Sequence, residues 1–254
     1  MRILITNDDG VDAPGIKVMQ QIAAELSDDV WVVAPDGNQS GASHRFTFGR
    51  ELSLDRRGPR EYAVLGGSPA DCVVAGMTHL CADRLPDLVL SGVNNGQNLG
   101  DIINCSGTAA GAREGALQGA VGIAMSQSVD YEARAEIAWD VARRHAAQVV
   151  RAILASRPDG ESYYNVNFPF CAPEDVKGIR VVPYQRFSRS PMRYYPSDSG
   201  DGKFFIAIPE TPMPLEDDRD FKLLMHAEAI TVTPVGLQAS DAALAARLDG
   251  QLRL

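Results

Sequence analysis

Two adjacent carboxylates, Asp8 and Asp9, follow the first apolar run of the chain. That run, residues 2–6, is short and has no helical period, which indicates a buried strand of a parallel sheet. Gly10 comes next, and a helix is expected from about Ile16 to Leu26. In open α/β sheets ligands bind at the carboxyl ends of the strands. The two carboxylates therefore lie where a binding site is expected.

Two carboxylates side by side repel each other, and partial burial increases the repulsion. In a regular strand their side chains would point to opposite faces, but Gly10 permits a turn that can bring both inward. A bound cation would then offset the repulsion. The alternative is a solvated loop in which an Asp caps the following helix, although Asp12, before Pro14, can supply that cap instead.

Two further polar groups follow later strands. Ser40 lies in the loop after a strand expected over residues 30–34, and Asn94 in the loop after one expected over residues 87–91. If these strands neighbour the first, two carboxylates, a hydroxyl and an amide converge. All of these donors are hard oxygens, which favour Mg²⁺ or Mn²⁺, with Ca²⁺ as an alternative, over zinc or copper. So few protein ligands leave coordination positions open, which is typical of a catalytic ion.

A candidate anion site lies where Ser106, Gly107 and Thr108 open a helix. Free backbone amides at a helix N-terminus, beside two hydroxyls, favour an anion such as phosphate. Glycines then recur every four residues as far as Gly119. Each interior glycine destabilises a helix by about 1 kcal/mol relative to alanine, so this spacing predicts close packing of the helix backbone. A metal ion beside such a helix end is the arrangement that phosphoryl transfer needs.

Three successive strand–loop–helix units are expected to position these groups. Their loops are polar, contain glycine and fall at the same edge of the sheet, so the alternation predicts a doubly wound parallel sheet with right-handed crossovers. Short strands over residues 51–54 and 61–65 are expected to form a hairpin. Ser68 is expected to cap a helix that runs to about residue 82.

Further elements are expected in the second half of the chain. They are strands at residues 121–126, 163–168, 178–182 and 229–233, a long helix from Glu132 to Leu154, and a short helix at residues 240–248. Residues 184–220 differ in character, with basic and aromatic residues among prolines and serines. They predict a projecting hairpin arm, with a mobile surface loop as the alternative. Without repeats or evident linkers, residues 1–254 are expected to form one domain with this arm.

The composition limits the partners and the location of the protein. The chain has 254 residues, 45% of them hydrophobic and 22% charged, which is ordinary for a globular protein. Its net charge of −9 gives no indication of a nucleic-acid duplex or an anionic membrane as partner. No apolar run approaches the roughly 18 residues of a membrane span. Scattered cysteines and the lack of a signal-peptide pattern predict a cytoplasmic location.

Known nucleotide-binding motifs do not account for the site. The sequence has no GxxxxGK[ST] P-loop and no GxGxxG after the first strand. The glycines at positions 92, 96 and 100 match neither pattern. Four dispersed histidines do not suggest zinc.

Several short motifs are specific in combination. They are ITNDDG at residues 5–10, APG at 13–15, VAPD at 33–36, QSG at 39–41, PDLVLSGVN at 86–94, then Gly96, Asn98, Leu99 and Gly100, and SGT at 106–108. Together they resemble the survival protein SurE family over roughly residues 1–126. Weaker similarity continues in NVNFP at 165–169 and TVTP at 231–234. The chain departs from the family in having Glu228 and Ala229 where members usually carry Gly-Tyr.

The resemblance implies a metal-dependent 5′-nucleotidase, that is, a nucleoside monophosphate phosphohydrolase, with a Rossmann-like three-layer α/β/α sandwich. It places the metal ligands on Asp8, Asp9, Ser40 and Asn94. It also implies a homodimer or homotetramer that exchanges the arm and the C-terminal segment, residues 229–254. We expect the phosphate to be held by Asn98, Ser106, Gly107 and Thr108. One carboxylate, with Asp9 preferred, is expected to orient or deprotonate the attacking water.

Several alternatives stay open at this point. Exopolyphosphatase or phosphodiesterase action would use the same metal. A non-catalytic module would bind a nucleotide or a metal without hydrolysing a substrate. His44, in the Ser40 loop, is either a general acid or a surface or capping residue. Three arginines of the arm, at positions 186, 189 and 193, either reach the site of a neighbouring subunit or are solvated.

Overall fold

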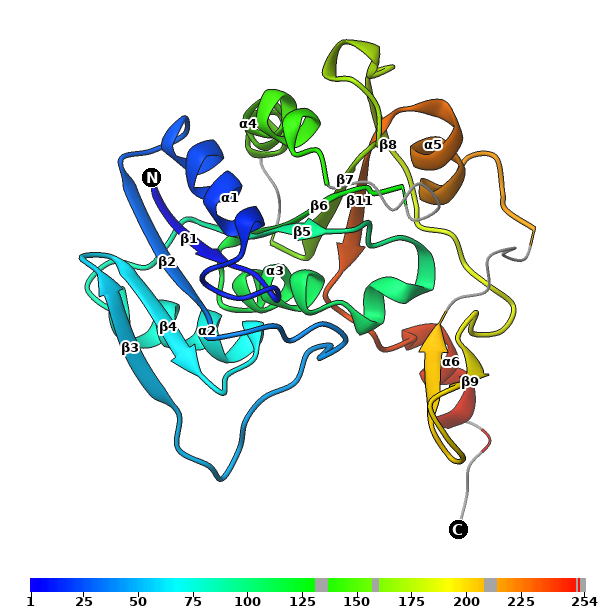
Figure 1. The fold of residues 1–254 in the computed structure, drawn as a ribbon, viewed down its shortest axis with the longest axis horizontal. Coiled ribbons are helices and arrows are strands. Elements are labelled where there is room, and N and C mark those ends of the chain that lie inside the picture. The colour runs from blue at the N-terminus through cyan, green and yellow to red at the C-terminus, as the bar shows by residue number, and fades with distance from the viewer. Residues whose placement is uncertain (131–136, 157–159, 208–213, 250, 252–254) are drawn as a thin grey trace.

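The computed structural model describes residues 1–130, 137–156, 160–207, 214–249 and 251. Among these residues, nine strands form one sheet in the order β3-β4-β2-β1-β5-β6-β7-β11-β8 (Figure 1). The strands are β1 Arg2–Thr6, β2 Asp29–Pro35, β3 Ser53–Gly58, β4 Glu61–Leu65, β5 Leu88–Asn95, β6 Val121–Gln127, β7 Ser162–Phe168, β8 Ile179–Val181 and β11 Ile230–Gly236. β1 and β5, which lead to Asp8 and Asn94, are neighbours in the interior of the sheet.

The sheet is mainly parallel. β1 pairs in parallel with β2 and β5, β6 lies between β5 and β7, and β4 continues the sheet beyond β2. β3 runs antiparallel to β4, and β11 antiparallel to β7. The central strand residues Ile3, Leu4 and Ile5 are fully buried. A strand covered on both faces needs such a continuous apolar run.

Helices cover both faces of the sheet. α1 (Pro14–Ala24) and α4 (Asp140–Ala155) contact each other and pack on the face that Ile3 and Ile5 line. α2 (Pro69–Ala75) and α3 (Gly107–Leu117) lie together on the face of Leu4 (Figure 1). This arrangement confirms the predicted three-layer α/β/α sandwich.

The start of α2 follows the sequence prediction. Ser68 Oγ accepts a hydrogen bond from Asp71 N at 3.2 Å, and Asp71 Oδ2 accepts one from Ser68 N at 2.9 Å. This reciprocal pair is a capping box, which satisfies two backbone amides at once. The α-helix ends at Ala75 and continues as one turn of π-helix, Gly76–Leu80, close to the expected end at residue 82.

The prediction of a side-chain cap by Asp12 is wrong. α1 begins after Ala13 without a side-chain cap, and Asp12 is exposed. The carboxylate of Asp12 instead points to solvent, 3.8 Å from Arg57 Nη1. Pro14 occupies the first turn, where its missing N–H leaves no amide unsatisfied.

The long helix does not extend through residues 137–139, contrary to the sequence prediction. α4 begins at Asp140, and residues 137–139 are not helical; the expected start at residues 132–136 lies outside the described residues. Trp139 is buried in the core, and Gln127 Oε1 accepts a hydrogen bond from Ala142 N at 3.1 Å. A side chain of β6 therefore satisfies an amide of the first turn and fixes where the helix begins.

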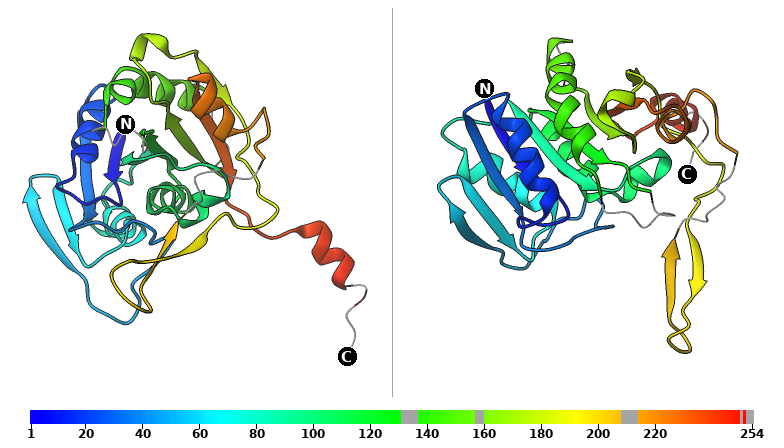
Figure 2. Two further views of the ribbon diagram at one scale, coloured as in Figure 1. Left: turned by 45° about the vertical axis from the view of Figure 1, so that its right-hand side comes forward. Right: turned by 45° about the horizontal axis from the view of Figure 1, so that its top comes forward.

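The segment after β8 holds two elements that matter for the site. β9 (Arg193–Pro196) and β10 (Phe204–Ala207) form a separate antiparallel hairpin, which projects from the body of the molecule (Figure 2). α5 (Asp220–Ala227) follows and was not predicted from the sequence. It is eight residues long and partly exposed, so its apolar pattern is weak. Residues 208–213 of the predicted arm lie outside the described residues.

The C-terminal α6 (Ala242–Asp249) also extends away from the sheet (Figure 2). Its residues are exposed. Across the part of the chain that the structure describes, helices are too short or too polar to span a bilayer.

The glycines of α3 explain how closely this helix approaches the sheet. A Cβ at Gly107 would lie 2.7 Å from Asp8 Cβ, one at Gly111 2.7 Å from Ser91 Oγ, and one at Gly115 2.5 Å from Val89 Cβ. Close packing is thus confirmed for three of the four positions. Gly119 lies beyond the helix end in open space, with φ +93°, where it terminates α3 as a left-handed residue.

Candidate metal and phosphate site

Asp8 lies at the carboxyl end of β1, within a turn that its neighbours hold. Asn7 Nδ2 donates to Gly10 O at 2.9 Å, and Gly10 N donates to Asn7 Oδ1 at 3.2 Å. Gly10 has φ +109°, and a Cβ on it would lie 3.1 Å from the backbone of Gly37. Only glycine combines this conformation with so close an approach. The turn therefore brings Asp8 and Asp9 against the loop that follows β2.

The carboxylate of Asp8 is buried against the start of α3. Its side chain is 4% exposed, and its Oδ1 accepts a hydrogen bond from Thr108 Oγ1 at 2.6 Å. Burial raises the pKa of Asp8, and the hydroxyl of Thr108 together with backbone amides, including those of Gly107 and Thr108, opposes the rise. The positive end of α3 is thus directed at this carboxylate.

Asp9 is less buried than Asp8. Its Oδ2 accepts a hydrogen bond from Asn95 N at 3.3 Å, which joins it to the end of β5. Burial and the charge of Asp8 raise the pKa of Asp9 to about 6. Within the described residues, Asp8 and Asp9 form ion pairs with neither lysine, arginine nor histidine. The hydrogen-bond partners of the two carboxylates are therefore backbone N–H groups and one hydroxyl.

The loop after β2 brings Ser40 to the same end of the sheet. Gln39 N donates to Asp8 O at 2.7 Å, so the residue before Ser40 is fixed beside the first carboxylate. Ser40 N donates to Asn38 Oδ1 at 2.7 Å, and the residue is exposed. The turn that carries the Ser40 hydroxyl is thus hydrogen-bonded to the backbone of Asp8.

Asn94 lies on the last part of β5, after an irregularity in the pairing with β6 between Ser91 and Asn94. The Gly92–Val93 peptide bond is cis. Asn94 Nδ2 donates to Gly96 O at 2.7 Å. With its amide nitrogen used in this way, Asn94 presents Oδ1 as the atom that can bind a cation.

These four residues fit a hard divalent ion. Two carboxylates without a cationic side-chain partner in the described part of the chain need a counter-charge. The remaining donors are a hydroxyl and an amide oxygen, which match Mg²⁺ or Mn²⁺. The described residues contain no group of three or more His, Cys, Asp or Glu side chains that could hold a metal ion. Any further protein ligands of an ion held by Asp8 and Asp9 would therefore be neutral oxygens.

The residues predicted to bind phosphate have different surroundings. Ser106 Oγ accepts a hydrogen bond from Ala109 N at 3.0 Å and caps α3. The hydroxyl of Thr108 is used on Asp8, and the backbone amides of Gly107 and Thr108 also face this carboxylate. Asn98 Nδ2 donates to Ser126 Oγ at 3.0 Å. The side chain of Asn98 is thus tied to the last part of β6.

Asn165 and Asn167, two residues for which the sequence pattern predicts no role, hold the Asn98 segment. Asn167 Oδ1 accepts a hydrogen bond from Asn98 N at 2.8 Å, while Asn165 Nδ2 and Asn167 Nδ2 donate to Asn98 O at 2.8 and 3.0 Å. Both side chains are fully buried on β7. An alternating Asn-Val-Asn pattern in an otherwise apolar strand is the signal in the sequence, because buried amides need specific partners.

His44 lies against α3. His44 Nε2 is 2.9 Å from Glu114 Oε2, and its Nδ1 is 3.3 Å from Arg113 Nη1. Ser43 of the same loop also donates from its backbone N to Cys105 O at 3.2 Å. The histidine therefore ties the Ser40 loop to the helix, an interaction that agrees with its structural interpretation.

The arginines of the arm are exposed. Arg193 Nη1 donates to Ser190 O at 2.5 Å and to Met192 O at 2.8 Å, within its own segment. In this arrangement its guanidinium supports the hairpin.

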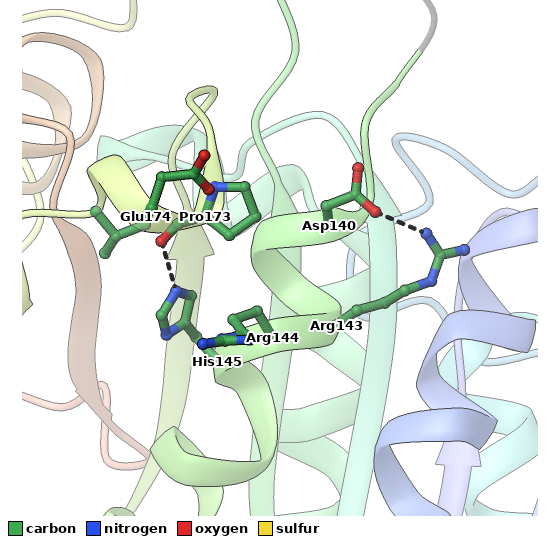
Figure 3. A pocket seen from close by; sticks show the side chains of 7 residues that line it. Asp140, Arg143, Arg144, His145, Pro173 and Glu174 are labelled. Atoms are coloured by element: carbon green, nitrogen blue, oxygen red, sulfur yellow. Dashed lines mark hydrogen bonds and ion pairs between the residues drawn. The ribbon is translucent and has the colours of Figure 1, made fainter.

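An open pocket of about 640 Å³ lies elsewhere, between the first turns of α4 and residues 173–176 (Figure 3). Its lining residues are Asp140, Arg143, Arg144, His145, Pro173, Glu174 and Val176. Two of the lining side chains already have partners: His145 Nε2 contacts Pro173 O at 3.0 Å, and Arg143 Nη1 contacts Asp140 Oδ1 at 3.4 Å. The predicted site residues do not line this pocket.

Known proteins resemble this chain over nearly its whole length. It is 42% identical over 253 residues to the protein named 5′-nucleotidase SurE of Rhodopseudomonas palustris (strain BisB5), covering 98% of each chain. It is 41% identical over 261 residues to 5′-nucleotidase SurE of Nitrobacter winogradskyi, covering 100% of each. The crystal structure of SurE protein from Aquifex aeolicus has a TM-score of 0.85 at 31% identity, covering 98% of this chain and 99% of that one.

A family model described as Survival protein SurE matches residues 3–190. This range includes Asp8, Asp9, Ser40 and Asn94, together with the start of α3. With the full-length relatives, it establishes the family: the chain belongs to the survival protein SurE family.

Proposed function

We propose that this chain is a divalent-metal-dependent phosphohydrolase that releases phosphate from nucleoside 5′-monophosphates, with 3′-monophosphates as a further substrate class. One observation carries the proposal: the buried carboxylate of Asp8, beside the partly buried Asp9, accepts hydrogen bonds from the start of α3 at one end of the sheet. Relatives named 5′-nucleotidase SurE support the reaction class.

The proposed cofactor is one Mg²⁺ or Mn²⁺ ion, held by Asp8, Asp9, Ser40 and Asn94. When bound, such an ion would neutralise charge on the phosphate and lower the pKa of a coordinated water. Thr108 fixes Asp8 by donating a hydrogen bond to Oδ1. The bond from Asn94 Nδ2 to Gly96 O occupies the amide nitrogen of Asn94 and leaves Oδ1 as the atom that can bind the ion. The chain thus fixes the orientation of two of the four ligands before any ion binds.

Phosphate is proposed to bind between the start of α3 and Asn98. Gly107 and Thr108 contribute backbone amides, Ser106 lies at the cap, and Asn98 contributes its side-chain amide. The positive end of the helix favours the equatorial oxygens of the phosphoryl group. Asp9, the more exposed carboxylate, is the proposed base that orients the water and takes its proton. A bond forms from the water oxygen to phosphorus, the bond from phosphorus to the nucleoside oxygen breaks, and that oxygen leaves as a hydroxyl group after taking up a proton from solvent.

We also propose that residues 1–254 form one cytoplasmic domain that assembles as a homodimer or homotetramer. The arm, residues 184–220, and the C-terminal segment, residues 229–254, are the proposed exchanged parts. The projecting hairpin and α6 (Figure 2) support this arrangement, because both expose apolar side chains. All four cysteines lie in the described part of the chain and are free, which fits a reducing compartment.

The decisive experiment measures phosphate release from a panel of nucleoside 5′- and 3′-monophosphates, polyphosphate and a phosphodiester. Each substrate is assayed with Mn²⁺, with Mg²⁺ and with a chelator. Release from the 5′-monophosphates that the chelator abolishes is the expected result. Release from polyphosphate or the diester alone would assign the same metal to another phosphohydrolase class. Nucleotide binding without phosphate release would leave a binding module.

Asp8→Asn is expected to abolish turnover while the protein stays folded. Asparagine keeps the Oδ1 acceptor for Thr108 but removes the negative charge that attracts the ion. A loss on the order of 10³-fold or more in kcat is expected, because charge stabilisation by a metal accounts for several kcal/mol. Asp12→Asn, at an exposed carboxylate four residues away, is the matched control. Hydrolysis at the wild-type rate in Asp8→Asn would remove the metal site from the mechanism.

A further inference from the structure

Another carboxylate, that of Asp220, belongs to the first residue of α5 and is fully buried. Its Oδ2 accepts a hydrogen bond from Gly100 N at 2.8 Å. Its Oδ1 accepts bonds from Gln185 N and Phe221 N, each at 2.8 Å. In the described part of the chain its donors are therefore backbone amides from three segments: the β5–α3 connection, the base of the arm and α5 itself.

The contact between the β5–α3 connection and the base of the arm is close. Gly100 has φ +59°, and a Cβ on it would lie 2.9 Å from Gln185 O and 3.1 Å from the ring of Phe187. Asp101 Oδ2 accepts a further hydrogen bond from Phe187 N at 2.8 Å. The rings of Phe187 and Phe221 meet edge to face, with centroids 5.8 Å apart. Asp220 lies at the centre of this contact.

The other side of the same connection rests on the sheet. Asn165 and Asn167 hold the backbone of Asn98 through both its N–H and its C=O. Asn98 is two residues before Gly100, so the segment from Asn98 to Asp101 is bonded to β7 on one side and to Asp220 and the arm on the other. A segment fixed from two sides cannot shift its backbone, and with it the position of the Asn98 Cα, without breaking one set of bonds.

We propose that Asp220 is a positioning residue that links the base of the arm to the segment carrying Asn98. This inference rests on the proposed function, in which Asn98 binds phosphate. The carboxylate suits the position because it accepts at both oxygens and carries no N–H. With Asp220 in place, the arm and the phosphate site form one bonded unit, and the fit of the phosphate depends on where the base of the arm lies.

Asparagine at position 220 has nearly the same shape but turns one acceptor into a donor. Whichever way the amide lies, its NH₂ group faces the N–H of either Gly100 or Gln185. At least one bond is lost and a buried amide is left without an acceptor. Asp220→Asn should therefore release the segment from the arm with little change in volume.

The test compares Asp220→Asn with wild type and with Asp218→Asn, an exposed carboxylate just before α5. Kinetics with a nucleoside monophosphate and Mn²⁺ give kcat and KM. Calorimetry gives the Kd of inorganic phosphate for the Mn²⁺-loaded protein, and titration gives the Kd of Mn²⁺ itself. We expect KM and the phosphate Kd to rise about tenfold in Asp220→Asn, since one buried hydrogen bond is worth about that factor. The Mn²⁺ Kd should stay within twofold, and Asp218→Asn should match wild type.

A purely structural role would lower the active fraction, and thus kcat, without moving KM or the phosphate Kd; that result overturns the inference. If Asp220→Asn does not fold, Asp101→Asn replaces it, because it perturbs only the bond from Phe187 N. An unchanged KM and phosphate Kd in Asp101→Asn would equally overturn it. The wild-type assay separates this outcome from failure of the proposed function, since wild-type protein that releases no phosphate contradicts the function itself.

Discussion

At the scale of single residues, the surroundings of Asp8 and Asp9 differ in a way that suits two roles. Asp8 is held by the hydroxyl of Thr108 and the amides of α3, so its position is fixed. Asp9 has one backbone donor, Asn95 N, and more contact with solvent. A fixed ligand and a more accessible base are what metal-assisted attack by water requires.

The raised pKa of Asp9 predicts a pH-dependent effect on stability. Burial and the charge of Asp8 raise this pKa to about 6 from 3.8, so the folded state binds the proton more tightly than the unfolded chain. Above pH 6 the carboxylate is charged and destabilises the metal-free fold; the penalty disappears as pH falls toward 4. Asp9→Asn should therefore stabilise the metal-free protein at pH 8 by about 1–2 kcal/mol, a value reduced for partial exposure.

Thermal unfolding in a chelator at pH 8 and pH 5 measures this effect. The gain should shrink to about half at pH 5, where the wild-type group is largely protonated when folded. With excess Mn²⁺ the order should reverse, because wild type gains stability from the bound ion and the variant does not. Equal melting temperatures of the two proteins at pH 8 in the chelator would show that the carboxylates do not repel each other.

The sequence predicts where a side chain lies when a strand end or a helix start fixes its position. It predicts less well which groups the side chain contacts when those groups are distant in the chain. Asp8 is an example of the first kind, because a buried strand followed by glycine can only present it at the sheet edge. Thr108 is an example of the second. Its place at a helix N-terminus predicted a phosphate contact, whereas its hydroxyl bonds to Asp8, one hundred residues earlier in the chain.

At the scale of elements, local patterns predicted those elements whose ends carry their own signals. Ser68, with Pro69 and Asp71 after it, marked the start of α2, and the structure has that capping box. The start of α4 depends instead on Gln127, which bonds to Ala142 from another strand. α5 depends on contacts of Asp220 with distant backbone. Sequence periodicity does not contain such information, because the partners meet only in the folded chain.

The end of α5 gives a prediction at this scale. Glu228 caps the helix with φ 49°, a left-handed conformation that favours glycine. A side chain there costs about 1 kcal/mol. Glu228→Gly is therefore expected to raise the melting temperature by about 2–4 °C.

Glu228→Ala is the control, because it removes the weak contact with Lys177, at 3.9 Å, but keeps a Cβ in the strained conformation. It should not stabilise the protein. Calorimetry of wild type and both variants makes the comparison, and an alanine variant as stable as the glycine variant would assign the effect to charge rather than to backbone conformation.

At the scale of the whole molecule, the hairpin of β9 and β10 exposes apolar side chains that packing within one chain does not explain. Tyr194 is 59% exposed and Phe205 65% exposed on a two-stranded sheet that projects into solvent. Apolar side chains gathered on such a projection are typical of a surface that another chain covers. A hairpin of two strands is also marginal on its own, so a neighbour would stabilise it.

Phe205→Asp is expected to weaken self-association at least tenfold, because a charge would be buried in the proposed subunit contact. Sedimentation over a range of concentrations measures the association constant. Leu85→Asp, at a leucine that is also exposed but outside the arm, should leave it unchanged. Association of Phe205→Asp equal to that of wild type would place the subunit contact elsewhere.

The order of strands also bears on how the molecule behaves when it begins to open. β1 and β5 occupy the interior of the sheet, three or more strands from either border, β3 or β8. Border strands lose their pairing first, because solvent reaches their hydrogen bonds from one side. Transient fraying at the margins therefore leaves the groups that meet between Asp8 and Asn94 undisturbed. The proposed site therefore lies beside the strands that are expected to open last, and its chemistry should tolerate opening of the sheet borders.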